Sequence, residues 1–235
     1  MESFALPIDC IDCKHLPNSI FCVLKPEELA LLNSSKTNKI YKKGSTLFHE
    51  GETVKGLHCI EYGKVKLFKT LDDGNMQILR ISASGEVIGY RGLLGNGIYI
   101  ATAEVLEDIQ VCFIPKLLVH QFLASNTEFA LRLMAKFASD LSEVEEKTVF
   151  FVQKSSKERL AEAILMLESS FGVNAENYIL LNLTRQELGA FTGLATETII
   201  RTLKTWEDLN ILELNKKKIK VVDREELKAI SSGKR

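Results

Sequence analysis

The sequence predicts an α+β protein with an N-terminal β-roll (jelly roll), a long dimerisation helix and a C-terminal winged helix-turn-helix. Three observations lead to this fold class. Ten of the fourteen glycines lie in the range Gly44–Gly97, where they separate short alternating runs typical of strands. Apolar residues then recur at spacings of four and three over Ala130–Phe151. Two helical segments meet at Thr192-Gly193 and precede a lysine-rich hairpin.

These signals divide the chain into four parts. Residues 1–24 form a cysteine-containing arm, residues 25–115 the β-roll, residues 116–152 the dimerisation helix and residues 153–235 the winged helix-turn-helix domain. Expected strands cover residues 45–48, 57–61, 64–69, 77–81, 98–105 and 109–114.

Composition indicates a globular protein of 235 residues, with 46% hydrophobic and 26% charged residues and a net charge of −1. No apolar run approaches the roughly 18 residues of a membrane span. The first residues lack the basic stretch and apolar core of a secretory signal. We therefore expect a cytoplasmic protein without a membrane partner.

The 4-3 spacing of apolar residues predicts a helix of about 30 residues with a heptad seam. Charged residues flank this seam, which favours pairing with a second copy of the chain. Packing of the helix on its own barrel is the alternative. The predicted dimer contacts are Met134, Phe137, Leu141, Val144, Thr148 and Phe151.

The strongest local signal lies in residues 183–206. Thr184 and Glu187 fit a capping box that begins a helix, and Gly193 allows the following turn. A second helix begins near Thr196, with Ile199, Leu203 and Trp206 as its buried stripe. An ordinary helical hairpin has the same spacing, but the basic β-hairpin that follows indicates a winged helix-turn-helix.

In this fold the second helix enters a major groove of DNA and the wing lies near phosphates. Residues 201–235 carry ten basic and six acidic side chains, which fits a confined nucleic-acid surface, although a solvated basic tail has the same composition. The candidate DNA contacts are Thr184, Arg185, Thr196, Glu197, Thr198, Ile200, Arg201, Lys204, Lys216, Lys217 and Lys218.

Four stretches together resemble the CRP/FNR family of bacterial transcription regulators, and the FNR branch most. They are KKGSTLFHEGE (Lys42–Glu52), GEVIG (Gly85–Gly89), SKERLAEAI (Ser156–Ile164) and the helix-turn-helix. The resemblance covers essentially the whole chain. It implies a cyclic-nucleotide-binding-like β-roll and a homodimeric regulator that binds a palindromic double-stranded operator and RNA polymerase.

The FNR-type recognition motif Glu-x-x-Ser-Arg is matched in part. Glu197 and Arg201 occupy the outer positions, where the carboxylate accepts from cytosine and the guanidinium pairs with guanine. Ile200 stands in place of the serine. An exposed isoleucine can still contact a thymine methyl. The resemblance therefore does not determine which base is read at this position.

The residues that hold a cyclic nucleotide in this family are missing. Its binders carry an Arg-Ser pair where this chain has Ile100-Ala101, and a glutamate where it has Tyr90. Without that cation the cyclic phosphate has no strong partner. We therefore expect no cyclic nucleotide.

The cysteines indicate a different effector. Cys10-x2-Cys13 followed by Cys22 resembles the N-terminal ligand run of FNR, although the spacing to the third cysteine is longer. Cys112 matches the distant fourth ligand and alternates with apolar neighbours on its strand. The resemblance implies a 4Fe-4S cluster that senses oxygen. Four thiolates suit zinc equally, and Cys59 is interpreted as a packed core thiol.

The remaining alternatives keep the DNA function but change the effector to no cofactor, haem or a small ligand in the barrel. An enzyme is not expected. The barrel offers only His49 and His58 as histidine ligands, and neither a glycine-rich phosphate loop nor a nucleophile elbow is present.

Overall fold

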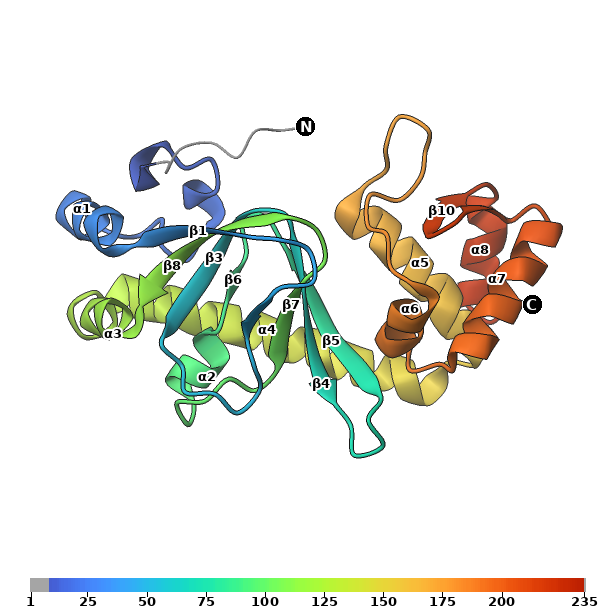
Figure 1. The fold of residues 1–235 in the computed structure, drawn as a ribbon, viewed down its shortest axis with the longest axis horizontal. Coiled ribbons are helices and arrows are strands. Elements are labelled where there is room, and N and C mark those ends of the chain that lie inside the picture. The colour runs from blue at the N-terminus through green and yellow to red at the C-terminus, as the bar shows by residue number, and fades with distance from the viewer. Residues whose placement is uncertain (1–8, 235) are drawn as a thin grey trace. The chain divides into compact units, whose positions relative to one another are not determined.

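The computed structural model describes residues 9–234, apart from the side chains of residues 150 and 151 (Figure 1). Phe151, a predicted dimer contact, therefore has a side chain outside the described residues. The chain forms two compact units. The first comprises the residues up to Lys69 together with Leu79–Ser142, and the second comprises Thr70–Ile78 and the residues from Glu143 onward.

The first unit contains the predicted β-roll, which confirms the fold class. One four-stranded sheet has the order β1-β8-β3-β6 and the other the order β2-β7-β4-β5. The strands are β1 (Thr37–Tyr41), β2 (Thr46–Phe48), β3 (Gly56–Tyr62), β4 (Lys64–Thr70), β5 (Met76–Ala83), β6 (Val87–Ile88), β7 (Thr102–Val105) and β8 (Ile109–Pro115). Leu57, Val65, Ala103 and Val111 are fully buried, since alternate residues of the strands face the core.

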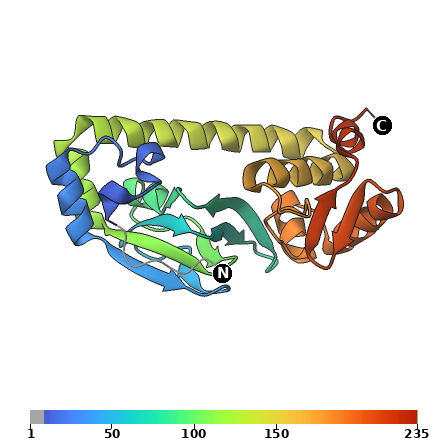
Figure 2. The ribbon, with the colours of Figure 1, turned by 90° about the horizontal axis from the view of Figure 1, so that it is seen from above.

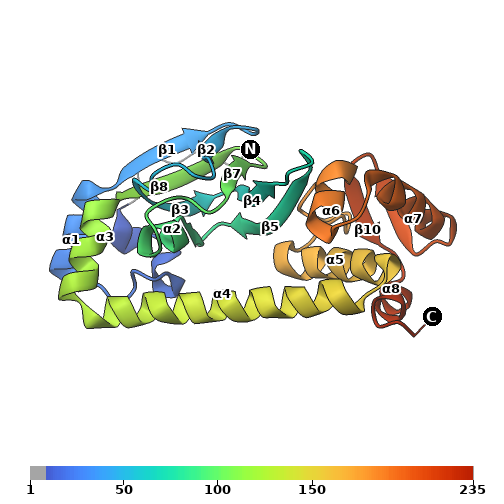
Figure 3. The same ribbon diagram turned by 90° about the horizontal axis from the view of Figure 1, so that it is seen from below.

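Helices lie at one end of this roll and along one side of it (Figure 3). They are α1 (Pro26–Ser35), α2 (Tyr90–Leu94), α3 (Lys116–Ser125) and α4 (Thr127–Gln153). The predicted single helix over residues 116–152 is thus two helices, interrupted at Asn126. The Asn126 side chain accepts the Phe129 amide at 3.0 Å and so starts α4. Phe122 and Phe129 lie on the two sides of the break. Both are buried, and their rings meet edge to face.

The second unit contains the predicted winged helix-turn-helix (Figure 2). Its elements are α5 (Ser156–Phe171), α6 (Arg185–Thr192), α7 (Thr196–Asp208), β9 (Leu212–Asn215), β10 (Lys218–Val221) and α8 (Arg224–Ser231). Leu160, Ile164, Leu188, Ile199 and Leu203 are buried between the helices. Among residues 9–234, every helix is too short or too polar to cross a lipid bilayer.

Candidate functional site

Interactions between residues close in sequence form the caps and the turn of the helix-turn-helix. Thr184 Oγ1 accepts the Glu187 amide at 3.0 Å, and Glu187 Oε2 accepts the Thr184 amide at 2.8 Å, which is the predicted capping box. Gly193 ends α6 with φ of +66°. A Cβ on Gly189 would lie 2.6 Å from the Leu194 carbonyl oxygen, so glycine is needed for this close turn.

The predicted stripe of α7 is buried and its opposite face is exposed. Ile199, Leu203 and Trp206 are at most 3% exposed, which fixes the rotation of the helix on the domain. Glu197, Ile200, Arg201 and Lys204 are exposed on the outer face, and Thr196 and Thr198 are half-buried. Lys204 forms ion pairs with Glu207 and Asp208 at 3.0 Å each. The outer face of α7 presents mixed polar groups suited to base edges.

The tip of the wing consists of Lys216 and Lys217, because Lys218 belongs to β10. Lys216 has φ of +54° in the turn, and both it and Lys217 are exposed. Arg185, expected to contact DNA, donates from Nη2 to the Lys216 carbonyl oxygen at 3.1 Å. Arg185 therefore also joins the start of α6 to the wing.

One face of α4 carries an exposed apolar stripe. Leu131, Met134, Leu141 and Val144 are between 46% and 61% exposed. Three of them belong to the predicted seam, and an uncovered stripe of this kind is typical of a surface that pairs with another chain. Thr148 is also exposed.

Phe137 differs from the other seam residues because it is half-buried in its own chain. Its ring meets that of Tyr90 edge to face, with centroids 5.2 Å apart. Part of the predicted seam thus packs on its own barrel, which is the alternative that the spacing left open.

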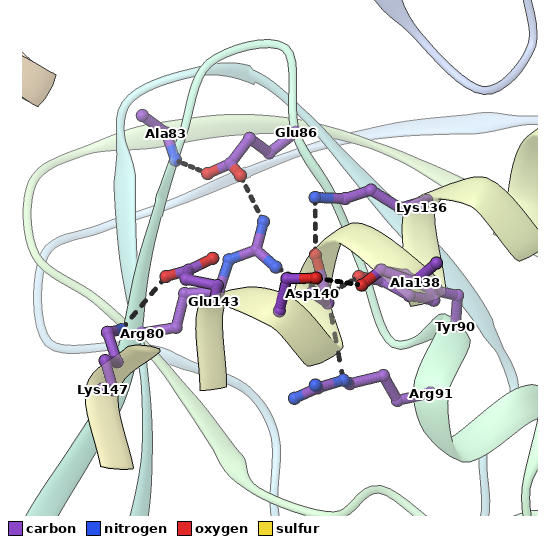
Figure 4. A network of polar contacts seen from close by, with 11 residues as sticks. Arg80, Ala83, Glu86, Tyr90, Arg91, Lys136, Ala138, Asp140, Glu143 and Lys147 are labelled. Atoms are coloured by element: carbon purple, nitrogen blue, oxygen red, sulfur yellow. Dashed lines mark hydrogen bonds and ion pairs between the residues drawn. The ribbon is translucent and has the colours of Figure 1, made fainter. Parts of the chain in front are cut away.

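Tyr90 also belongs to a polar network between the β-roll and α4 (Figure 4). Its hydroxyl donates to Asp140, a carboxylate with a side chain only 3% exposed. Arg80 Nη1 and Lys136 Nζ lie 2.9 Å and 2.8 Å from the oxygens of Asp140, and Arg80 also pairs with Glu86. Burial alone would raise the pKa of Asp140, but the hydrogen bonds and the nearby cations outweigh it and lower that pKa.

Replacing Asp140 with Asn is expected to lower the free energy of unfolding by about 3 kcal/mol, because it leaves the buried Arg80 without one of its anions. The contribution of Asp140 is present above the unfolded carboxyl pKa, about 3.9, and is lost as pH falls through the lower folded pKa. Denaturant unfolding at several pH values measures both effects. Asp108→Asn is the matched control, since Asp108 pairs with Lys42 at the surface. Equal losses for the two variants would contradict this role of Asp140.

A second site is a pocket at the face where the N-terminal arm lies against the roll. Cys10, Cys13 and Cys112, three of the four predicted cluster ligands, line this pocket. Cys22 is not among the lining residues, whereas Cys59 is. Cys59 packs against the hydrophobic core as predicted, and it also lines this pocket, which the sequence interpretation did not predict.

The electrostatics of the pocket combine burial with one nearby cation. Burial raises the pKa of Cys10, and raises that of Cys112 to about 11, while the charge of Lys36 opposes both shifts. The Cys112 Sγ donates to Glu61 Oε2 at 3.9 Å. In the described part of the chain, no group of three or more His, Cys, Asp or Glu residues is arranged to hold one metal ion.

Side chains of a different chemical type stand at the positions that bind a cyclic nucleotide in the family. Tyr90 is buried and bound to Asp140, and Ala101 is buried while Ile100 is 39% exposed. None of these three side chains carries a cation. The expectation that no cyclic nucleotide binds therefore stays a prediction for direct measurement.

Family models match both units. The model described as "Cyclic nucleotide-binding domain" matches residues 38–126, and that described as "Crp-like helix-turn-helix domain" matches residues 158–230. "Electron transport regulator A" of Shewanella oneidensis is 28% identical over 232 residues, which are 97% of this chain and 92% of that protein. "Fumarate and nitrate reduction regulatory protein" of Salmonella typhimurium is 26% identical over 238 residues, 100% of this chain and 95% of that protein.

Solved structures show the same fold. FixK2 from Bradyrhizobium japonicum has a TM-score of 0.74 at 23% identity, over 83% of this chain and 96% of that chain. A Crp/Fnr-family structure from Eubacterium rectale has a TM-score of 0.77 at 19% identity, over 91% of this chain and 97% of that chain. The order of β-roll, long helix and helix-turn-helix is common to these structures and this chain.

Proposed function

Because the chain belongs to the CRP/FNR family of transcription regulators, we propose that it acts as a homodimer which binds a palindromic operator and responds to oxygen or redox state through a 4Fe-4S cluster. DNA binding and transcription regulation are common to the family, which consists of regulators rather than enzymes. The operator, the dimer and the cluster each rest on particular residues.

Operator recognition is assigned to α7 and the wing. Glu197 and Arg201 lie one turn apart on the exposed face of α7, where they would read cytosine and guanine edges. Lys216 and Lys217 would lie near phosphates. A symmetric dimer places two such helices in half-sites about 34 Å apart. Contact with RNA polymerase follows from the family resemblance.

The homodimer is assigned to the exposed stripe of α4, with Met134, Leu141 and Val144 at its centre. These side chains are apolar and uncovered, and burying them against a second α4 removes their surface from water. The same residues lie at the 4-3 spacing that two parallel helices require.

Redox sensing rests on one observation: the thiols of Cys10, Cys13 and Cys112 line a common pocket beside the cation of Lys36. When bound, a 4Fe-4S cluster supplies the oxygen-reactive chemistry that these side chains lack. Lys36 would offset the negative charge of the thiolates. Cys112 lies three residues before Pro115, where α3 begins, so the arm is anchored directly before the helices. A difference of a few kcal/mol between arm positions suffices to change the DNA-competent population.

The proposal predicts a brown protein when it is purified without oxygen, with about four irons and four sulfides per chain. Fluorescence anisotropy with an operator selected from random-sequence DNA is expected to show tight binding before exposure to air and weak binding after it. Iron and sulfide analysis on the same sample checks the cofactor. Iron-free protein that binds the operator equally in both states would contradict redox sensing and leave only DNA recognition. Zinc without sulfide would exclude the cluster.

A further inference from the structure

We infer that the fourth ligand of the cluster is Cys59 rather than Cys22, so that the ligand set is Cys10, Cys13, Cys59 and Cys112. This inference rests on the proposed function, because it names the residues that hold the proposed cluster. It departs from the arrangement that the resemblance implies, in which three ligands come from the arm. Here two ligands come from the arm and two from neighbouring strands of one sheet.

The composition of the pocket is the first support. Four of the five cysteines of the chain line it, and Cys22 does not. Most of the other lining side chains are apolar, as a site that limits access of water to a cluster requires. They include Leu16, Phe21, Leu32, Ile60, Val87 and Ile114.

Strand register is the second support. In the antiparallel pair β3–β8, Cys59 stands directly opposite Cys112. Directly opposed residues of an antiparallel pair project from the same face, with Cβ atoms about 4.5–5.5 Å apart. The two side chains therefore leave the sheet as neighbours on the same face.

The arm is held over this pair of thiols from two sides. The Cys10 amide donates to Asn33 Oδ1 of α1 at 2.9 Å, and Asn33 in turn donates to Asp9 at 2.8 Å. His15 Nε2 donates to the Glu61 carbonyl oxygen at 3.0 Å. These bonds place the segment with Cys10 and Cys13 against β3 and β8, where both thiols line the pocket.

The segment with Cys22 is held by contacts with α4 and with Asn126, directly before α4. Phe21 is 4% exposed and stacks on Phe129 of α4, with ring centroids 5.6 Å apart. Ile20 is also buried, and the Val23 carbonyl oxygen accepts from Asn126 Nδ2 at 3.4 Å. Phe21 lines the pocket but Cys22 does not. Turning Cys22 into the pocket would disturb the contacts with Phe129 and Asn126. Cys59 needs no such rearrangement.

A zinc ion and a 4Fe-4S cluster place different demands on four thiols. Four thiolates around one zinc ion, each about 2.3 Å from it, lie about 3.8 Å apart. Each cysteine of a 4Fe-4S cluster binds a different iron, so its four sulfurs surround a larger group. Four thiols line one pocket, which is the number that a cluster needs. Lys36 also lines this pocket, where its charge would balance that of the thiolates.

Two serine variants test the inference. Full-length Cys59→Ser and Cys22→Ser are purified without oxygen and analysed for iron, sulfide and absorbance. We expect Cys22→Ser to keep the iron and sulfide of the wild type and Cys59→Ser to lose most of both. Retention by Cys59→Ser, or loss by Cys22→Ser, would overturn the assignment. A wild type without iron and sulfide would instead overturn the proposed function itself, so the two failures are distinguishable.

A buried strand position needs a control for folding. Cys59→Ala is expected to lose the cluster while it keeps the circular dichroism spectrum and the sedimentation of the wild type. The wild type gives a second readout through alkylation with iodoacetamide and mass spectrometry. Cys22 should be modified whether the cluster is present or has been removed by a chelator, whereas Cys10, Cys13 and Cys112 should react only after removal. Protection of Cys22 by the cluster would overturn the inference.

Discussion

Leu141→Lys is expected to convert the protein to monomers and to remove operator binding. Leu141 is 58% exposed at the centre of the apolar stripe of α4, between Met134 and Val144. In a symmetric dimer the substitution buries two unpaired ammonium groups, and each costs about 3–5 kcal/mol. Even one such group raises the dissociation constant of the dimer more than about a hundredfold. Sedimentation velocity measures the dimer, and anisotropy with the selected operator measures binding.

The matched control is Leu117→Lys. Leu117 is an exposed leucine on α3, away from the stripe, so its lysine variant should remain dimeric and bind DNA. Phe137 is a poorer test site, because its ring packs on Tyr90 and its loss would also disturb the β-roll. A dimeric Leu141→Lys protein with normal operator binding would show that this face of α4 is not the interface.

Arg201→Ala is expected to weaken binding to the selected operator by about 1–3 kcal/mol and to remove selectivity at one G·C pair. Arg201 is exposed on α7, opposite the buried stripe of Ile199, Leu203 and Trp206, so its guanidinium is free to reach a base edge. Anisotropy titrations with the operator, with single-base variants of it and with scrambled DNA measure both effects.

Lys217→Ala is the control for base readout. Lys217 is exposed at the tip of the wing, where a lysine contacts phosphate and carries no sequence information. Its loss should weaken all DNA sequences alike and reduce the salt dependence of binding by about one charge. If Arg201→Ala weakens operator and scrambled DNA equally, Arg201 contacts the backbone rather than a base.

The helix-turn-helix was predictable because its signals are local. Thr184 and Glu187 cap α6 from within one turn, and Gly193 ends that helix. The buried face of α7 follows from a spacing of three and four residues. The candidate contacts Arg201 and Lys217 were found in the same way, since a residue opposite a buried stripe or at a hairpin tip is exposed in any context.

The break between α3 and α4 was harder to predict. Asn126 accepts the Phe129 amide, but it also reaches Glu28, 98 positions earlier in the chain, at 2.7 Å. The apolar period begins only at Ala130, so it gave no information about this turn, which a distant partner helps to hold. The heptad spacing also did not predict that Phe137 faces the β-roll of its own chain while Leu141 faces outward.

The sequence by itself determined the β-roll, the long helix and the winged helix-turn-helix, because hydrophobic period, glycine turns and helix caps act over a few residues. Only the tertiary structure decided which thiols meet and which charges are buried. Cys59 and Cys112 are 53 positions apart and face each other through the register of two strands. Asp140 is buried because Arg80 and Tyr90 reach it from the β-roll. The register of the strands and the packing between distant segments depend on the whole core. No local pattern in the sequence therefore predicts them.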